Sequence, residues 1–69
     1  MDYESTQYEC DVWQGVVVIT CKETRKCGSI ALKDSKRRMN AGQMIKSDVE
    51  RFGTEKTLAT YAKLVTNWQ

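Results

Sequence analysis

The chain has 69 residues and a mass of 7.9 kDa, so residues 1–69 are predicted to form a single small domain. That length excludes barrels and doubly wound sheets, which need far more chain. Hydrophobic residues make up 41% and charged residues 29%, which separates the chain from disordered proteins. No apolar run reaches the roughly 18 to 20 residues of a transmembrane helix, so no membrane partner is expected.

The net charge of +2 conceals an uneven distribution of charge along the chain. Residues 1–21 contain four carboxylates and no Lys or Arg, whereas residues 22–38 contain seven Lys and Arg side chains against two carboxylates. Such block asymmetry points to a polar partner surface more than to a substrate pocket. In the alternative interpretation, the two blocks lie on neighbouring strands and neutralise each other.

The cysteines bear on the redox environment. Cys10, Cys21 and Cys27 are an odd number that cannot pair completely within one molecule. The start of the chain is acidic and polar, unlike a secretory signal, so free thiols and a cytoplasmic location are expected. Cys21 and Cys27 flank a predicted loop and could face each other across a strand ladder, although free cysteines usually act as small buried hydrophobic residues.

The first part of the chain has strand patterns. Residues 8–13 alternate so that Tyr8, Cys10 and Val12 share one face, and Gln14-Gly15 predicts a tight turn or a bulge. The β-branched run at residues 16–21 predicts the central strand. Residues 27–32 predict another strand, joined to it through a basic loop at residues 22–26.

The second part has helical spacing. Ala41, Ile45, Val49 and Phe52 form one apolar stripe, with Asn40 and Gln43 as a predicted capping box. Gly53 is expected to end this helix in a left-handed conformation, and Thr54 to cap the next helix. The stripe of that second helix contains Leu58, Tyr61, Ala62, Val65 and Trp68. The prediction is an α+β fold: a two- or three-stranded antiparallel sheet, built on a β-hairpin, followed by two C-terminal helices.

No residue set in the sequence predicts catalysis. Histidine is absent, the four glycines are scattered and form no phosphate loop, and the serines have only lysines as candidate bases. The cysteines contain no CxxC pair, and structural zinc sites normally use four Cys or His ligands. We therefore expect no enzymatic activity, no metal and no cofactor.

The basic segment supplies the candidate residues for binding a partner or a nucleic acid. They are Lys22, Arg25, Lys26, Lys33, Lys36, Arg37 and Arg38. They are expected to point outward together as one positive face, close to the positive end of the first helix dipole. Alternatively, such cations serve solubility and keep edge strands from aggregating.

Four apolar residues are candidate interface anchors: Trp13, Tyr61, Leu64 and Trp68. The apolar arc of the second helix, which includes Leu64, covers nearly half of its circumference, whereas packing on one small sheet needs a stripe of about 100°. A second subunit or another protein could cover the excess, and Trp and Tyr are favoured anchors at interfaces. The alternative is that the first helix covers them.

One alternative function rests on a coarse resemblance. Residues 27–65 run strand, helix, glycine, helix, which resembles ribbon-helix-helix repressors, with Thr54 and Thr57 supplying part of the polar start of the second helix. The segment around Val49, Gly53 and Ala59 is also similar to a helix-turn-helix. These resemblances imply a DNA-binding regulator, acting as a homodimer whose strand pair reads the major groove.

The function expected first is a non-catalytic accessory or inhibitory regulator. It would dock on a larger protein or ribonucleoprotein complex that handles nucleic acid, through the basic segment. Stand-alone domains without a cofactor motif or catalytic set are typical of phage and mobile-element inhibitors, and this chain is similar to anti-CRISPR proteins in size and style only.

Overall fold

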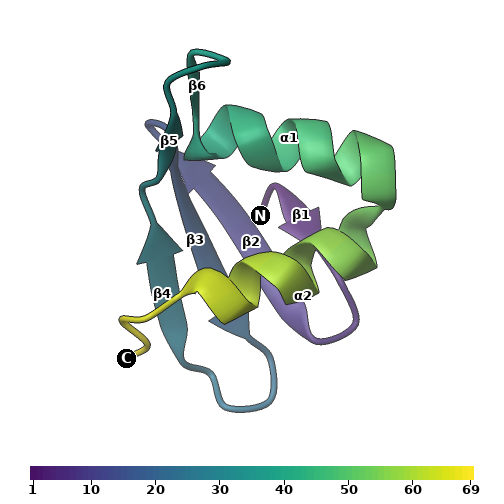
Figure 1. Ribbon diagram of the computed structural model, residues 1–69. Coiled ribbons are helices and arrows are strands. Elements are labelled where there is room, and N and C mark those ends of the chain that lie inside the picture. Colours follow the sequence, from purple (N-terminus) through teal and green to yellow (C-terminus); the bar gives the residue numbers. More distant parts are fainter.

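Six strands and two helices make up the computed structural model, which describes all 69 residues (Figure 1). The elements are β1 (Tyr3–Glu4), β2 (Tyr8–Trp13), β3 (Val16–Cys21), β4 (Cys27–Ile30), β5 (Lys33–Asp34), β6 (Met39–Asn40), α1 (Ala41–Phe52) and α2 (Thr54–Leu64). The predicted α+β fold is confirmed: a four-stranded antiparallel sheet precedes two C-terminal helices. Neither helix combines the length and the apolar composition needed to cross a membrane.

The sheet is a meander in the order β1-β2-β3-β4, so β3 is an interior strand as predicted. Trp13 pairs with Val16, and the two residues between them form the tight turn that connects β2 to β3. Gln14 and Gly15 both have positive φ, 48° and 79°, the backbone twist that two-residue hairpin turns require. The predicted alternation also holds, because Cys10 is buried and Tyr8 and Val12 are packed against the core.

The structure contains two strand pairings that were not predicted. β1 adds a fourth strand, with Tyr3 opposite Cys10, but it has only two residues and is too short for an alternating pattern to reveal. Residues 27–32 were predicted as one strand, but β4 ends at Ile30. The chain then forms a second hairpin, in which Lys33 pairs with Asn40 and Asp34 with Met39.

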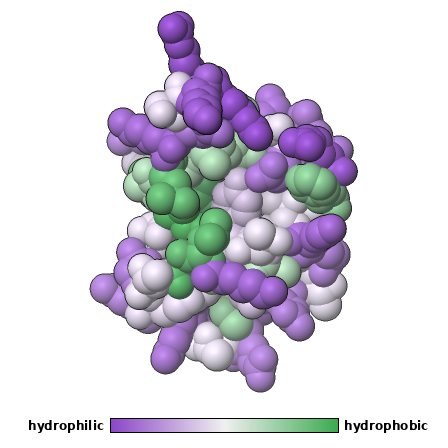
Figure 2. Space-filling model, in the orientation of Figure 1, coloured by the Kyte–Doolittle hydropathy of each residue, from purple (hydrophilic) through white to green (hydrophobic).

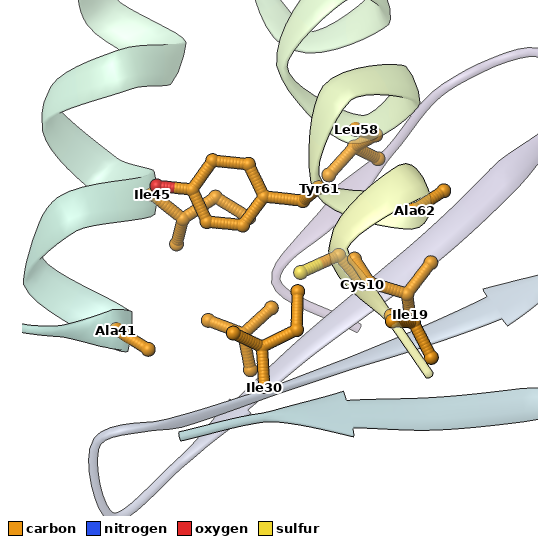
Figure 3. Close-up of a cluster of buried hydrophobic side chains, with 10 residues drawn as sticks. Cys10, Ile19, Ile30, Ala41, Ile45, Leu58, Tyr61 and Ala62 are labelled. Carbon is orange, nitrogen blue, oxygen red and sulfur yellow. The ribbon is translucent and has the colours of Figure 1, made fainter. Parts of the chain in front are cut away.

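Both helices cover the same face of the sheet (Figure 1). The core between the two layers is formed by buried side chains of the sheet, among them Cys10 and Ile19, and of the helices, among them Ile45, Leu58 and Tyr61 (Figure 3). No element covers the opposite, outer face. By the strand register, this outer face contains Glu9, Asp11, Trp13, Val16, Val18, Thr20, Cys27 and Ser29.

The start of α1 is as predicted, whereas the junction with α2 differs. Asn40 accepts the N–H of Gln43, whose side chain accepts the N–H of Asn40, so the capping box is present. Gly53 has the expected positive φ of 88°, but its ψ of 159° is extended and not left-handed helical. Thr54 is not a cap: Gly53 occupies the N-cap position of α2, without a side-chain hydrogen bond, and Thr54 is the first helical residue.

The chain after α2 is extended, which corrects the predicted helical stripe through Trp68. Val65 follows α2 with φ −71° and ψ 128°, yet its side chain is buried. Residues 65–69, here called the C-terminal tail, then run along the free edge of β4. Cys27 and Gln69 exchange two backbone hydrogen bonds of 3.0 and 2.9 Å, and the Asn67 side chain bonds to the backbone and hydroxyl of Ser29. These bonds satisfy the edge that β4 would otherwise expose.

Candidate functional site

The seven predicted binding cations lie at opposite ends of the sheet and do not form the single positive face that we expected (Figure 1). Lys22, Arg25 and Lys26 belong to the β3–β4 loop, whereas Lys33, Lys36, Arg37 and Arg38 belong to the β5–β6 hairpin. β4 runs antiparallel to β3, so it carries the chain from one end to the other. A six-residue strand such as β3 spans about 20 Å, well beyond the roughly 8 Å over which exposed charges interact at physiological salt.

The β3–β4 loop is held close to the body of the protein. Lys22 forms an ion pair with Glu4 of β1, so the acidic and basic blocks do meet at this one point. The backbone N–H of Arg25 donates to the carbonyl of Cys21 at 2.8 Å, and Arg25 has a positive φ of 64°. Arg25 and Lys26 remain exposed.

The β5–β6 hairpin projects from the body and has an ordered tip. Asp34 Oδ1 accepts the backbone N–H groups of Lys36 and Arg37 at 3.1 and 3.2 Å, and its other oxygen lies 3.4 Å from Arg37 Nε. Arg38 has a positive φ of 55°, which completes the turn. The hairpin therefore has four exposed cations, of which Arg37 pairs with the Asp34 carboxylate. Figure 2 shows the tip as the most protruding hydrophilic part of this view.

The base of this hairpin is fixed to the sheet and to α1. Asn40, the last residue of β6, is also the N-cap of α1. The N–H of Gly42 in the first turn of α1 donates to the carbonyl of Gly15 at 3.3 Å, and the Asn40 side chain lies against Gly15. The β2–β3 turn, the hairpin and the start of α1 therefore form one structural unit, which we call the hairpin end of the molecule.

The predicted apolar anchors have different environments. Trp13 is 70% exposed and Leu64 is 50% exposed, whereas Trp68 is half-buried against the core. Tyr61 is only 5% exposed, and its hydroxyl donates to Asp48 Oδ2 at 2.7 Å, so it is a core residue and not an interface anchor. Burial, together with this hydrogen bond, raises the pKa of the Tyr61 hydroxyl.

Leu32 is a further exposed apolar residue, and the predicted strand at residues 27–32 did not identify it as a candidate for binding. It lies between β4 and β5, immediately before the basic hairpin, and is 53% exposed. Its signal in the sequence is the abrupt change from Ile30-Ala31-Leu32 to Lys33-Asp34, where the apolar run meets the cations. Figure 2 shows an apolar patch below the hydrophilic hairpin.

Trp13 and Leu32 both belong to the hairpin end. Trp13 immediately precedes the β2–β3 turn, and its side chain lies on the outer face of the sheet. Leu32 follows the end of β4 that pairs with β3 next to this turn. The hairpin end therefore combines four exposed cations with a largely exposed tryptophan and an exposed leucine. Tryptophan and arginine are the residues most enriched among the energetic anchors of protein interfaces.

The cysteines do not converge. Cys27 pairs with Thr20 and points to the outer face, whereas Cys21 pairs with Tyr8 on the opposite face, so the expected approach of Cys21 and Cys27 is wrong. All three thiols are free. Burial raises the pKa of Cys10 to about 12, while hydrogen bonds from the backbone and side chain of Thr24 lower the pKa of Cys21. No three Cys, Asp or Glu side chains lie close enough together to hold a metal ion.

The arrangement around β4 bears on the resemblance to ribbon-helix-helix repressors. In those proteins the strand pairs with the same strand of a second subunit. Here β4 is paired with β3 on one edge and with the C-terminal tail on the other, so a strand pair between two copies would have to displace the tail. No family model, curated protein or solved structure matches this chain.

Proposed function

We propose that this protein is a non-catalytic binding protein, an accessory or inhibitory regulator. It docks by its hairpin end on an acidic, partly apolar surface of a larger protein or ribonucleoprotein assembly that handles nucleic acid. The observation that carries the proposal is the combination at this one end: Trp13 is 70% exposed beside an ordered, projecting hairpin that contains four cations.

The apolar residues favour a protein surface over a nucleic-acid duplex. The backbone of a duplex is bound through Lys and Arg, and that binding does not need an exposed tryptophan and leucine beside the cations. Leu32, unlike an aromatic ring, has no face on which an unpaired base could stack. In a protein interface, by contrast, apolar anchors in the centre supply affinity, and charged residues around them supply orientation and association rate. Trp13 and Leu32 fit the first role, and Lys36, Arg37 and Arg38 fit the second.

The hairpin also suits recognition because little order has to be gained on binding. Asp34 holds the tip through two backbone hydrogen bonds, and Asn40 fixes its base to α1. Each flexible side chain immobilised at an interface costs about 0.5 to 1.5 kcal/mol. An ordered hairpin restricts this cost to the cationic side chains themselves.

The test begins with a photo-crosslinking amino acid at Lys36, whose side chain is exposed at the tip. The crosslinked protein is identified and purified, and its affinity is measured for the wild type and for variants. Arg37→Glu/Arg38→Glu is expected to weaken binding at least about tenfold, and Trp13→Ala about 30-fold or more. A matched control, Arg25→Glu/Lys46→Glu, makes the same change in net charge elsewhere and is expected to change affinity less than about threefold.

Two results would contradict the proposal. One is a control variant that loses as much affinity as Arg37→Glu/Arg38→Glu, which would show that total charge and not the hairpin determines binding. The other is tight binding to a random duplex, abolished by Arg37→Glu/Arg38→Glu and unaffected by Trp13→Ala. The logarithm of that binding constant would fall with the logarithm of salt concentration by about 0.9 per phosphate contacted, as expected for a direct DNA-binding regulator.

A further inference from the structure

A cavity of about 360 Å³ lies at the other end of the molecule, away from the hairpin end. Its wall is assembled from β2, the β3–β4 loop, the last turn of α2 and the C-terminal tail, so it exists only in the folded chain. Small-molecule sites usually measure about 300 to 1,000 Å³, and this cavity is near the lower limit. It therefore suits one small ligand.

The charge of the wall selects anions. Lys26 of the loop and Lys63 of α2 both line the cavity, and no Asp or Glu does. Lys26 has no ion-pair partner, unlike Lys22, which is paired with Glu4. Two ammonium groups are donors suited to a phosphate.

The other part of the wall is aromatic. Tyr8 and Trp68 line the cavity and are half-buried, so part of each ring is covered by the core and part faces outward. Trp68 is held by the residues on either side of it: the Asn67 side chain bonds to Ser29, and Gln69 exchanges two backbone hydrogen bonds with Cys27. The backbone on both sides of Trp68 is therefore fixed before any ligand arrives, which lowers the entropic cost of binding.

We propose that this cavity binds a nucleoside phosphate, with its base stacked on Trp68 and its phosphate on Lys26 and Lys63. Aromatic rings beside cations are the combination by which proteins bind nucleotide units, because every base has a face that can stack. The ligand is either a free mononucleotide or one nucleotide of a single strand, since the same contacts serve both. This site is independent of the proposed docking by the hairpin end.

The experiment uses Trp13→Phe, which leaves Trp68 as the single tryptophan, and follows its fluorescence during titration with AMP. AMP is expected to quench Trp68 and to bind at least about tenfold more tightly than adenosine or inorganic phosphate alone. Lys26→Ala/Lys63→Ala is expected to weaken AMP binding at least about tenfold. Lys46→Ala/Lys56→Ala removes two charges outside this cavity, so it is the matched control and is expected to change AMP binding less than about twofold.

A second titration distinguishes a free mononucleotide from one nucleotide of a single strand as the natural ligand. If the site takes one nucleotide of a strand, a ten-residue oligodeoxyadenylate binds at least about tenfold more tightly than AMP and loses affinity as salt rises. If the site takes a free nucleotide, AMP binds as tightly as the oligonucleotide. In both cases the ligand is expected to slow alkylation of Cys21, which lines the same cavity, at least about threefold.

The proposal is overturned if neither AMP nor the oligonucleotide quenches Trp68 up to about 10 mM. It is also overturned if quenching occurs and is unchanged in Lys26→Ala/Lys63→Ala. Both lysines are exposed, so the variants are expected to fold, and circular dichroism checks that they do.

Discussion

At the β3–β4 end of the molecule, cations lie among aromatic rings and a thiol, around an open cavity that the C-terminal tail helps to line. At the hairpin end, cations stand on a projecting tip beside Trp13 and Leu32. Both groups of cations come from residues 22–38 of the chain, and β4 separates them. The surroundings of a charge, and not its density in the sequence, therefore decide whether it can meet a large surface or a small ligand.

The thiols give the largest expected contrast. Cys21 is at the β3–β4 end with a lowered pKa, whereas Cys10 is fully buried with a pKa raised to about 12. The thiolate is the reactive form, so at neutral pH iodoacetamide is expected to alkylate Cys21 at least about a thousandfold faster than Cys10. Mass spectrometry of the labelled peptides measures each site.

The pH dependence follows from the same pKa directions. Because the pKa of Cys21 is lowered, its thiolate persists at a lower pH than an ordinary thiol, whose pKa is near 9, and its alkylation rate should reach half of its maximum below that pH. The same thiol in the urea-unfolded chain serves as the reference. A midpoint for Cys21 that is no lower in the folded protein than in the unfolded chain would contradict the placement of Thr24 against Cys21.

Gly28→Ala should damage only the β3–β4 end. A Cβ atom at Gly28 would lie 2.1 Å from Val65 Cγ1 and 2.9 Å from Asn67 Oδ1, so the C-terminal tail must move. We expect a loss of about 1 to 3 kcal/mol in the free energy of unfolding, measured by urea denaturation. In a Trp13→Phe background, the emission of Trp68 should shift to the red as the tail leaves the core.

Gly53→Ala is the control for this prediction. Its Cβ atom would meet nothing within 4 Å, so the variant carries only the strain of a positive φ with an extended ψ, about 1 to 3 kcal/mol, and leaves the tail in place. An equal red shift of Trp68 emission in both variants would show that the tail responds to global stability and not to contact with Gly28.

The smallest expected effect concerns the tip of the hairpin. Asp34→Ala removes the acceptor of the Lys36 and Arg37 N–H groups, so amide hydrogen exchange at both residues should accelerate about fivefold, equivalent to about 1 kcal/mol. Asp34→Asn keeps an acceptor oxygen and should leave exchange nearly unchanged, while raising the salt concentration needed for elution from heparin. Equal acceleration in both variants would mean that charge, and not the hydrogen bonds, orders the tip.

Much of the fold could be predicted from local patterns because those patterns depend on neighbouring residues. The alternation at Tyr8, Cys10 and Val12, the Gln14-Gly15 turn and the Asn40–Gln43 capping box are all set within a few residues, and the structure contains each of them. The two-residue strands β1 and β5 are too short to have a period, so they depend on partners elsewhere in the chain.

The candidate sites were less predictable. Sequence could identify the cations and Trp13, but could not show that Tyr61 faces inward to Asp48, because a helical stripe has the same spacing in a core and in an interface. The sequence also could not predict the cavity at Trp68. Its wall joins residues separated by up to 60 positions, and no local pattern links them.

Local patterns were enough to predict β2, β3, the ends of α1 and the uneven distribution of charge, since backbone preference and side-chain periodicity act over short distances. Tertiary structure alone decided which charges are neighbours. β4 reverses the direction of β3 and carries Lys33 to Arg38 to the far end of the sheet, while the C-terminal tail brings Trp68 to Lys26. Proximity in space depends on how strands pair, and pairing is a property of the whole chain.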